Sequence, residues 1–349
     1  MSTARQIGEK SRLSEAKARG LCSRAFMRFG VPETAAWEAA APLVTAEMMG
    51  IATHGLSRVV DYTTRIAAGG IDAKAVPQVE ALAPALVRVD GQDALGPLTA
   101  TRALQAGVIA ARAAGVAAVF VRRGTHVGAL APYLLDAAGQ GFACVFTCNT
   151  APMIAPAGAR TAMVGNMPLG IGLPGGGGGP LILDMAMTVV SRSRIRAAAE
   201  AGHDIPEGWA MGPDGTPTTD PVAGLKGLIA PIGGEKGARL ALSLDLFSGL
   251  LSGARFMDDI PDTHRTPEKA PGVGYAILLI DADRLLGKAA LAARMQTAQD
   301  KLANARAVDP ESAPRLPGAR ALAALRTARA EGFQPDPETL AKLTALATG

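Results

Sequence analysis

Two of the four histidines in this chain lie in short motifs whose residue types suit acid–base chemistry. In the motif GIATHGLSR, His54 precedes Arg58 by four positions, so the two side chains share one face if the segment is helical. An arginine binds a carboxylate through two parallel N–H bonds, and a histidine can protonate a forming alkoxide near neutral pH. The pair suits the reduction of a 2-oxo acid, although a helix-end histidine beside a solvated arginine has the same spacing.

The second histidine of interest, His126, lies in GTHVGA, directly after the apolar run at 116–121. That run predicts a buried strand, and open α/β sheets contact ligands beyond the carboxyl ends of their strands. A loop histidine that is hydrogen-bonded only to its neighbours is the alternative. The other two, His203 and His264, lie in polar, proline-rich segments and are expected to face solvent.

Several common site motifs are absent from the sequence or lack their proper context. No HExxH motif and no cluster of His and Cys residues occurs, so no metal site is expected. Neither a GxxxxGK[ST] nor a GxSxG motif is present, which argues against a P-loop and a serine hydrolase. The stretch GIGLPG (170–175) matches GxGxxG by letter, but a glycine run and a strand follow it instead of a helix. We interpret it as a chance match.

Two further stretches suit phosphate binding. The glycines of PIGGEKG (231–237) precede an amphipathic helix at 238–252, and a helix N-terminus can bind an anion through its free N–H groups. An ordinary loop and helix cap is the alternative. In SRSRIR, Arg192, Arg194 and Arg196 alternate and would point to one side of a strand, where they would suit a 2′-phosphate. A solvated face is the favoured interpretation of this run.

The composition predicts a globular protein of a reducing compartment. Among the 349 residues, 48% are hydrophobic and the formal net charge is +4, with no basic block interleaved with aromatic residues, so nucleic-acid binding is not expected. The three cysteines form no CxxC pair, which favours a cytoplasmic protein without disulfides. The N-terminus is polar, and no run of about 18 apolar residues predicts a membrane span.

The pattern of elements predicts an α/β fold. The helical segments 14–30 and 32–50 come first, and a helix opened by Gly96-Pro97 and closed by Gly115 follows. Helix and strand then alternate. The expected strands are 116–121, 142–149, 180–186 and 274–281. In the helix after PIGGEKG, an apolar stripe holds Leu240, Leu244, Phe247 and Leu251. We expect a helical subdomain at 1–80, completed by 283–349, and an α/β domain at 81–282 for cofactor and substrate.

Taken in order, these segments resemble the malate/L-lactate dehydrogenase superfamily, which is distinct from the Rossmann-type lactate and malate dehydrogenases. That superfamily includes sulfolactate, ureidoglycolate, 2,3-diketogulonate and piperideine-2-carboxylate oxidoreductases. The resemblance covers residues 13 to 345. The motifs that carry it are GIATHGLSR, GTHVGA, FTCNT, GNMPLG, LDMAMTVVS, GWAMGPDGTPTTDP, PIGGEKG and RLPGAR.

The resemblance implies roles for particular residues and a shape for the whole. It implies His54 as proton donor, Thr53 beside it as a catalytic hydroxyl, and Arg58, His126 and Asn166 as substrate contacts. It also implies NAD or NADP as cofactor, a small carboxylate as substrate and a homodimer with sites near the subunit interface. The implied fold is a three-layer α/β/α or α+β core with a mixed sheet, a non-Rossmann cofactor site and an all-helical N-terminal subdomain joined by C-terminal helices. The cofactor contacts implied are His126, Val127, Gly128, Ala129, Leu130, Asp184, Met185, Ala186, Glu235, Lys236, Gly318, Ala319 and Arg320.

Several positions depart from the family pattern. The residue before His54 is Thr53 instead of the usual serine, and Asn166-Met167 replaces the usual Thr-Asn pair. Where the imine-reducing branch has an aspartate that assists the catalytic histidine, this chain has Arg194, which cannot accept a proton from the imidazole. Three functions follow: reduction of a 2-oxo acid, reduction of a cyclic imino acid, and binding of a dinucleotide or metabolite with little catalysis.

Overall fold

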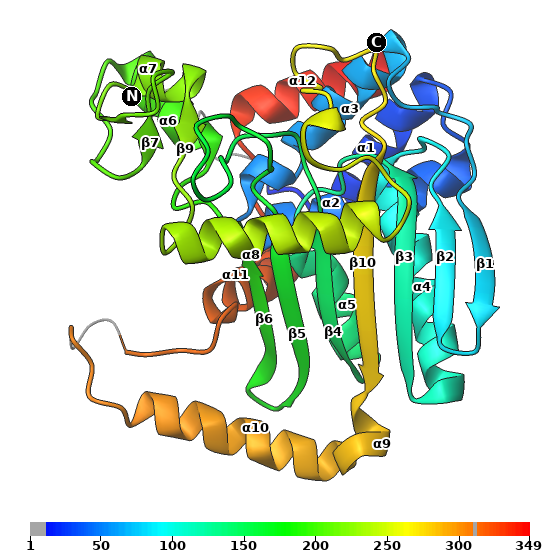
Figure 1. The fold of residues 1–349 in the computed structure, drawn as a ribbon. Coiled ribbons are helices and arrows are strands. Elements are labelled where there is room, and N and C mark those ends of the chain that lie inside the picture. The colour runs from blue at the N-terminus through cyan, green and yellow to red at the C-terminus, as the bar shows by residue number, and fades with distance from the viewer. Residues whose placement is uncertain (1–11, 310–312) are drawn as a thin grey trace, which may run out of the picture.

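The computed structural model describes residues 12–309 and 313–349, and a seven-stranded mixed sheet forms its centre (Figure 1). The strand order is β1-β2-β3-β10-β4-β5-β6. Among these strands β2 and β3 pair in parallel, and the other neighbours pair antiparallel. The bounds are β1 Gln78–Ala83, β2 Leu86–Asp90, β3 Val116–Gly124, β4 Phe142–Cys148, β5 Leu169–Gly176, β6 Gly179–Met185 and β10 Val273–Asp281. The α/β class and mixed sheet expected from the sequence are confirmed.

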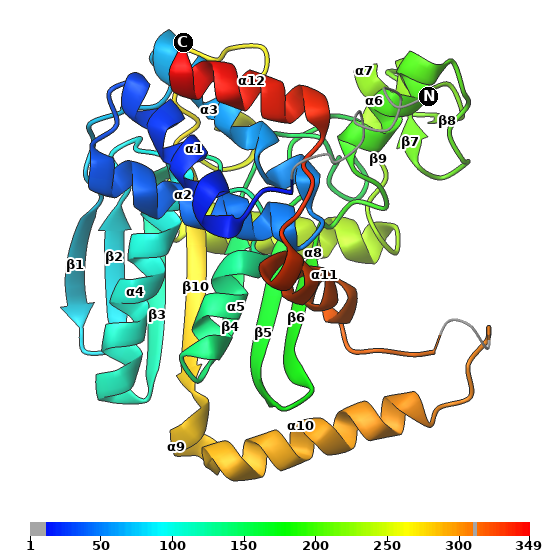
Figure 2. The ribbon, with the colours of Figure 1, turned by 180° about the vertical axis from the view of Figure 1, so that it is seen from behind.

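Helices α4 (Gly96–Ala114) and α5 (Ala131–Gly139) cover one face of this sheet, as Figure 2 shows. Pro97 lies in the first turn of α4, and Gly115 ends it in a left-handed conformation, as the sequence predicts. Gly107 brings α4 close to the sheet, since a Cβ there would lie 2.7 Å from both Val119 and Leu279. The small residues of α4 therefore set the close packing between helix and sheet.

A layer of helices lies over the ends of the strands: α1 (Glu15–Arg28), α2 (Glu33–Met48), α3 (Ser57–Ala68) and α12 (Pro337–Thr348). Ser14 caps α1 by accepting a hydrogen bond from the Lys17 N–H group, which confirms the predicted cap. Buried residues of this layer and of the sheet belong to one hydrophobic core.

A small lobe projects beside the sheet (Figure 1). It contains α6 (Arg192–Ala201), α7 (Pro221–Lys226) and a three-stranded sheet of β7 (Ala210–Met211), β8 (Pro217–Thr218) and β9 (Leu228–Ile229). The lobe has an apolar core of its own, formed by Val190, Ile195, Ile205, Ala210 and Ile229.

The C-terminal part begins with α9 (Ala282–Leu286) and α10 (Lys288–Ala303), which runs past the β5–β6 hairpin, where Gln299 donates a hydrogen bond to the Gly179 carbonyl. Helix α11 (Ala319–Glu331) then packs near β6, and α12 returns to the helical layer. The boundaries 1–80, 81–282 and 283–349 stay a prediction.

Helix α8 (Glu235–Asp245) crosses the face of the sheet opposite to α4 and α5, and a wider π turn at Leu246–Leu250 continues it. Three members of its predicted apolar stripe are exposed, Leu240, Phe247 and Leu251 at 44%, 38% and 58%, although the Phe247 ring also packs against Phe120 of β3. The fourth member, Leu244, is half-buried and packs against an apolar cluster. The residues buried beneath are small or polar: Gly237, Ala238, Ala241, Asp245, Ser248 and Gly249. The helix therefore exposes several large apolar side chains of the kind that a surface helix normally buries.

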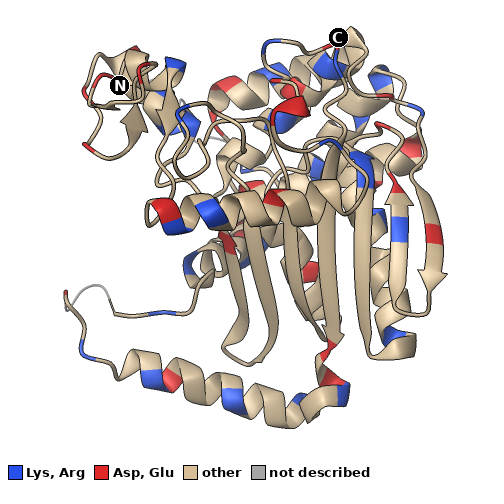
Figure 3. Cartoon of the chain, in the orientation of Figure 1, with Lys and Arg blue, Asp and Glu red and all other residues tan. Residues whose placement is uncertain are grey.

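The part of this sheet face that α8 leaves uncovered is also apolar. One cross-strand row passes through five strands and is half-buried throughout: Ala118, Leu278, Val145, Ile171 and Leu183. At the far end of the face, Val116 and Ile280 are 48% and 42% exposed. Strands β4 and β5 carry no charged residue, as Figure 3 shows.

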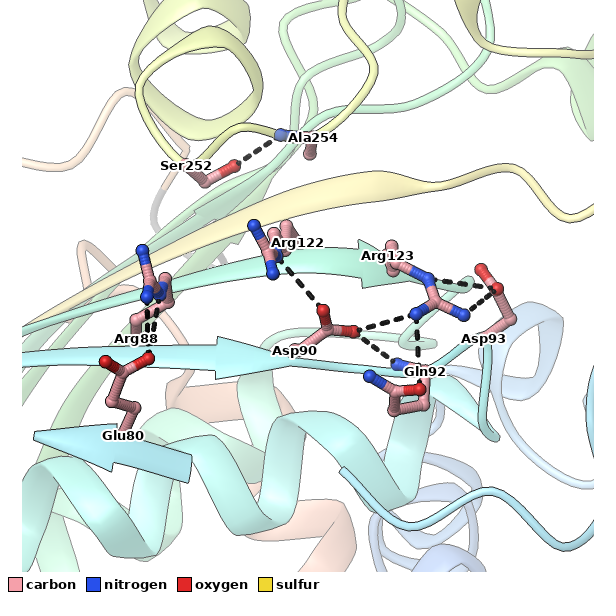
Figure 4. A network of polar contacts seen from close by, with 9 residues as sticks. All are labelled: Glu80, Arg88, Asp90, Gln92, Asp93, Arg122, Arg123, Ser252 and Ala254. Carbon is pink, nitrogen blue, oxygen red and sulfur yellow. Dashed lines mark hydrogen bonds and ion pairs between the residues drawn. The ribbon is translucent and has the colours of Figure 1, made fainter. Parts of the chain in front are cut away.

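A polar network lies at the carboxyl ends of β2 and β3 (Figure 4). Arg122 and Arg123, at the end of β3, pair with Asp90 and Asp93 at 3.0 and 2.9 Å. Backbone bonds from Gly91 and Asp93 to the same two arginines tie the turn after β2 to β3. The network therefore fixes the carboxyl end of β3 just before the loop that carries His126.

Candidate active site

The sheet topology brings the ends of four strands to one edge. Strands β3 and β4 both run antiparallel to β10, so their carboxyl ends lie at the same edge, together with the start of β5 and the end of β6. His126 follows β3, Thr150 follows β4, Asn166 precedes β5, and Asp184 lies near the end of β6. The segment between α2 and α3, which carries His54, lies over this edge in the helical layer.

His54 ends a short 3-10 turn (Ala52–His54) rather than lying within a helix. Glu47, near the end of α2, anchors this turn, since its Oε2 accepts a hydrogen bond of 2.9 Å from the Leu56 N–H group just before α3. Gly55 leaves room for that carboxylate, because a Cβ at position 55 would overlap Oε2 of Glu47. Burial raises the pKa of Glu47, and the bond from Leu56 lowers it in part.

Arg58 lies in the first turn of α3 and is oriented from two sides. Its Nε donates to the Thr53 carbonyl at 2.7 Å, and its Nη1 donates to Asp61 at 2.7 Å. Its Nη2 has no hydrogen-bond partner among the described residues. A guanidinium held in this way has a free N–H edge for a carboxylate.

The imidazole of His54 contacts the Thr53 hydroxyl, with 3.0 Å between Oγ1 and Nδ1. Burial, and then the charge of Arg58, lower the pKa of His54 to about 4. The ring stacks on that of His126, with 5.7 Å between centroids and an interplanar angle of 26°. The structure thus brings together all three of the residues that the sequence singled out for acid–base and carboxylate chemistry.

His126 is held by Tyr62, for which no role was predicted. The Tyr62 hydroxyl lies 2.7 Å from Nδ1 of His126, and the Gly128 N–H group donates to the same nitrogen at 3.3 Å. Burial, and then the positive charge of Arg58, hold the pKa of His126 well below its usual value. Tyr62 follows Arg58 by four positions on α3, which is the one sequence signal that could have found it.

Three of the four predicted cofactor segments meet at strand β6. Asp184 of β6 accepts hydrogen bonds from the Leu130 and Ala131 N–H groups at 2.8 and 2.9 Å, at the start of α5. A backbone bond from Ile182 to the Pro317 carbonyl places Gly318, Ala319 and Arg320 beside β6. Glu235 and Lys236 instead begin α8, which crosses the other face of the sheet, and only a bond from Ile232 to the Met187 carbonyl joins the turn before them to the residues after β6.

Among the predicted cofactor segments, only the start of α8 has features that suit a dinucleotide phosphate. The turn before α8 contains Gly233 and Gly234, both with positive φ and both facing open space. The first N–H groups of a helix have no partner within it, and Lys236 adds a positive charge there. At α5, by contrast, Asp184 already occupies the first N–H groups.

The remaining candidates have local roles. Asn166 exchanges two hydrogen bonds with the Thr150 hydroxyl, and no bond joins it to His54 among the described residues. Arg192, Arg194 and Arg196 lie on helix α6, not on a strand, so they do not point to one side as an extended segment would make them. The described residues include no cluster of His, Cys, Asp and Glu that could hold a metal ion. In the same ranges no helix is long and apolar enough to span a membrane.

Comparisons with known proteins agree on one family. Residues 13–344 match the family described as malate/L-lactate dehydrogenase. A Δ1-pyrroline-2-carboxylate reductase of Ancylobacter novellus is 32% identical over 97% of this chain and 98% of its own length. A (2R)-3-sulfolactate dehydrogenase (NADP+) of Chromohalobacter salexigens is 33% identical over 77% of this chain and 80% of its own. The structure of Δ1-piperideine-2-carboxylate reductase from Pseudomonas syringae superposes with a TM-score of 0.87 at 28% identity, covering 96% of this chain and 99% of that one.

Proposed function

The chain belongs to the malate/L-lactate dehydrogenase family and is an oxidoreductase, and we propose that it reduces a small 2-oxo acid to the 2-hydroxy acid with NADH or NADPH. The observation that carries the proposal is the pairing of His54, a titratable imidazole, with Arg58, whose Nη2 is free for a carboxylate. A 2-oxo acid presents a carboxylate and an adjacent carbonyl, which are the two groups that this pair can bind and protonate.

Each residue has a definite task in this reaction. Arg58 holds the substrate carboxylate, and its bonds to Asp61 and the Thr53 carbonyl fix the direction of that grip. His54 donates a proton to the C2 oxygen, while the Thr53 hydroxyl orients the ring through Nδ1. When bound, the nicotinamide cofactor supplies the hydride that C2 receives. The residues along β6, with Glu235 and Lys236 at the start of α8, would hold that cofactor.

The low pKa of His54 couples its protonation to substrate binding. In the free protein, burial and the charge of Arg58 both disfavour the imidazolium. A substrate carboxylate on Arg58 offsets that charge and adds a negative one close to His54, which raises the pKa of the imidazole. His54 therefore takes up its proton together with the substrate, and the acid is charged only when there is something to protonate.

Reduction of a cyclic imino acid is the second candidate, since one relative covering almost the whole chain carries the name of a Δ1-pyrroline-2-carboxylate reductase. Such a substrate has the same carboxylate beside a C=N bond, so Arg58 and His54 would act in the same way. Arg194, at the position where the resemblance implies an aspartate for the imine-reducing branch, lies exposed on α6 of the small lobe, and no bond joins it to His54 among the described residues. The departures at Thr53, Asn166 and Met167 motivate a third candidate, a protein that binds the dinucleotide with little turnover.

An oxidation screen separates the three candidates. NADH and NADPH are each offered with a panel of small 2-oxo acids and with piperideine- and pyrroline-2-carboxylate, and the loss of absorbance of the reduced cofactor is followed. We expect turnover with at least one 2-oxo acid and a preference for one cofactor. Turnover confined to the cyclic imines would replace the proposal with the second candidate. Cofactor binding by calorimetry without any turnover would support the third.

We also propose that two copies associate through the apolar sheet face and α8. The support is the outward-pointing stripe of Leu240, Phe247 and Leu251, continuous with the uncharged strands β4 and β5. Exposed apolar surfaces of this kind mark protein contacts. A second copy of the same chain fits because β4 and β5 carry no charge and Arg239 of α8 is paired with Glu235 within the chain, so a two-fold pairing brings few like charges together.

Sedimentation of charged variants tests the association. Leu251→Glu introduces a charge on the stripe, and we expect it to convert a dimer into a monomer. Ile109→Glu is the matched control, because Ile109 is 71% exposed on α4, which covers the other face of the sheet. A monomeric wild-type protein, or a Leu251→Glu variant that stays dimeric, would contradict this arrangement.

We further propose a cytoplasmic location. Cys22, Cys144 and Cys148 are all buried with free thiols, and burial raises the pKa of each. Buried unpaired thiols suit a reducing compartment. Cell fractionation with an antibody to the chain tests this, and recovery with a membrane or secreted fraction would contradict it.

A further inference from the structure

We propose that Tyr62 is a positioning residue that locks His126 as a neutral imidazole with its proton on Nε2, so that His126 donates a hydrogen bond to the substrate carboxylate beside Arg58. This inference rests on the proposed function for the identity of the substrate. It assigns the two stacked histidines different tasks: His54 moves a proton, whereas His126 keeps its own.

The first step of the argument is the hydrogen bonding at Nδ1 of His126. The backbone N–H group of Gly128 points at this nitrogen at 3.3 Å, and a backbone N–H group can only donate. Nδ1 must therefore be an acceptor without a proton of its own. The Tyr62 hydroxyl, 2.7 Å away, then donates as well, and a neutral imidazole with a bare Nδ1 carries its proton on Nε2.

The surroundings support the neutral form. Tyr62 is only 2% exposed, and burial raises the pKa of its hydroxyl, so it remains a protonated donor. The groups that act on His126 electrostatically are Arg58 and Arg65 from α3, His54 from the 3-10 turn and His264 from the loop before β10. All of them oppose a second positive charge, and none supplies a carboxylate to stabilise one.

The two imidazoles therefore differ in what they can exchange. His126 has no free lone pair, because Nδ1 accepts from Tyr62 and Gly128, and its Nε2 proton cannot leave without forming an imidazolate. His54 meets only the Thr53 hydroxyl at Nδ1, and a hydroxyl can donate or accept. His54 can thus change its protonation state without losing that contact.

The neutral Nε2–H group of His126, which lies among cations, suits the carboxylate of the proposed substrate. Arg58 and Arg65 already give this region a positive potential, so an anionic carboxylate is drawn to it. A third cation would add repulsion in the free protein, whereas Nε2–H adds a directed hydrogen bond without charge. A neutral amide or ester of the same oxo acid would gain less from this pocket.

The state of the ring is measured without any substrate. Protein labelled with ¹⁵N at its four histidines is studied by NMR, with each ring assigned through its His→Gln variant. We expect His126 to show an unprotonated Nδ1 and a protonated Nε2 that do not change between about pH 6 and about pH 8. A proton on Nδ1, or titration of this ring within that range, would overturn the proposal even if the protein proved to be an active reductase.

The part played by Tyr62 is tested with Tyr62→Phe and a double-mutant cycle. We expect Tyr62→Phe to change the Nδ1 resonance of His126 and to raise KM for the 2-oxo acid about tenfold, with a smaller fall in kcat. Added to His126→Gln, it should cost nothing further, because its effect passes through the ring. The control Tyr133→Phe removes a buried hydroxyl that bonds the Val127 carbonyl at 2.8 Å, and it should leave the Nδ1 resonance unchanged.

Three results would count against the role of Tyr62: an unchanged Nδ1 resonance in Tyr62→Phe, an unchanged KM, or additive effects in the cycle. If Tyr62→Phe does not fold, the wild-type spectrum still decides whether His126 is the neutral Nε2–H form. If no 2-oxo acid is turned over, the proposed function fails, while the NMR result on the ring stands or falls by itself.

Discussion

The loop that carries His54 and the loop that carries His126 are each held by a carboxylate from another segment. They differ in the other hydrogen bonds that hold them. Each ends where a helix begins, and in each a partly buried carboxylate from another segment accepts hydrogen bonds from N–H groups at that helix start. Glu47 does so for Leu56 before α3, and Asp184 does so for Leu130 and Ala131 at α5.

The difference lies beyond the carboxylates. The loop 125–130 is tied at four more points, from the Thr125 hydroxyl to Ala94, from Tyr275 to the Thr125 carbonyl, from Tyr133 to Val127 and from Tyr62 to His126. In the turn before α3, by contrast, the further side-chain bonds to the backbone come from the chain neighbours Ser57 and Arg58, and the side chains of Ala52 and Thr53 are exposed. The proton donor therefore stands on an exposed turn held beyond Glu47 by its own neighbours, whereas the hydrogen-bond donor stands on a loop held by several distant segments.

The largest effect should follow from removing Arg58, the residue proposed to bind the substrate carboxylate beside His54. Arg58→Ala is expected to lower kcat/KM for the 2-oxo acid about a thousandfold, mostly through KM, because a buried charge-assisted pair is lost. The pKa of His54 should rise at the same time, since Arg58 is the second cause of its depression. Steady-state rates across pH measure both, with Arg88→Ala, from an exposed ion pair with Glu80, as the control. Equal losses in the two variants would contradict this role.

The two carboxylate anchors should differ in the stability they give. Asp184→Ala leaves two backbone N–H groups without an acceptor, whereas Glu47→Ala leaves one. At about 1.5 kcal/mol for each bond to a charged group, we expect losses of about 3 and about 1.5 kcal/mol in the free energy of unfolding. Urea denaturation gives both values. A larger loss in Glu47→Ala would reverse the comparison between the loops.

A smaller effect is expected from a side chain at position 55, in the loop that carries His54, because it would overlap Glu47. Gly55→Ala costs stability through the overlap of its Cβ with the Glu47 side chain. We expect a loss of about 1 kcal/mol and a lower kcat, with part of the stability regained in the double variant with Glu47→Ala. Gly139→Ala, where a Cβ meets open space, is the control for both measurements. Additive losses in the double variant would show that the overlap is not the cause.

The smallest effect concerns stability against acid. His54 and His126 have pKa values below those of an unfolded chain, so both favour folding at neutral pH. That contribution is lost as the pH falls from about 6.5 through the folded value, about 4 for His54. Asp184 and Glu47, whose pKa values are raised by burial, act in the opposite direction. The drop in Tm between about pH 7 and about pH 4.5 should be smaller in His54→Gln than in the wild type. An equal drop in the two proteins would mean that His54 contributes nothing to acid stability.

Local patterns predicted much of the fold and the central pair of the site. The cap at Ser14, the proline and glycine that bound α4, and the apolar runs that became β3 and β4 depend on neighbours in the chain. The same is true of His54 and Arg58, which lie four positions apart. Their order of elements differs from the expectation, since His54 ends a 3-10 turn and only Arg58 lies in α3.

Contacts between distant segments were beyond such patterns. Tyr62 and His126 are 64 positions apart, and Asp184 lies 54 positions from Leu130, so only the packed sheet shows which groups share a hydrogen bond. The outward stripe of α8 was hidden for another reason. An amphipathic pattern shows which side of a helix is apolar, but not whether the chain's own sheet covers that side.

Turnover of a 2-oxo acid by His54→Gln tests the central role of His54 most directly. His203→Gln is measured beside it, because His203 is an exposed histidine of the small lobe. We predict that His54→Gln lowers kcat at least a hundredfold while the reduced cofactor binds with unchanged Kd, and that His203→Gln behaves as the wild type. A His54→Gln variant that turns over within about twofold of the wild type would show that another group donates the proton.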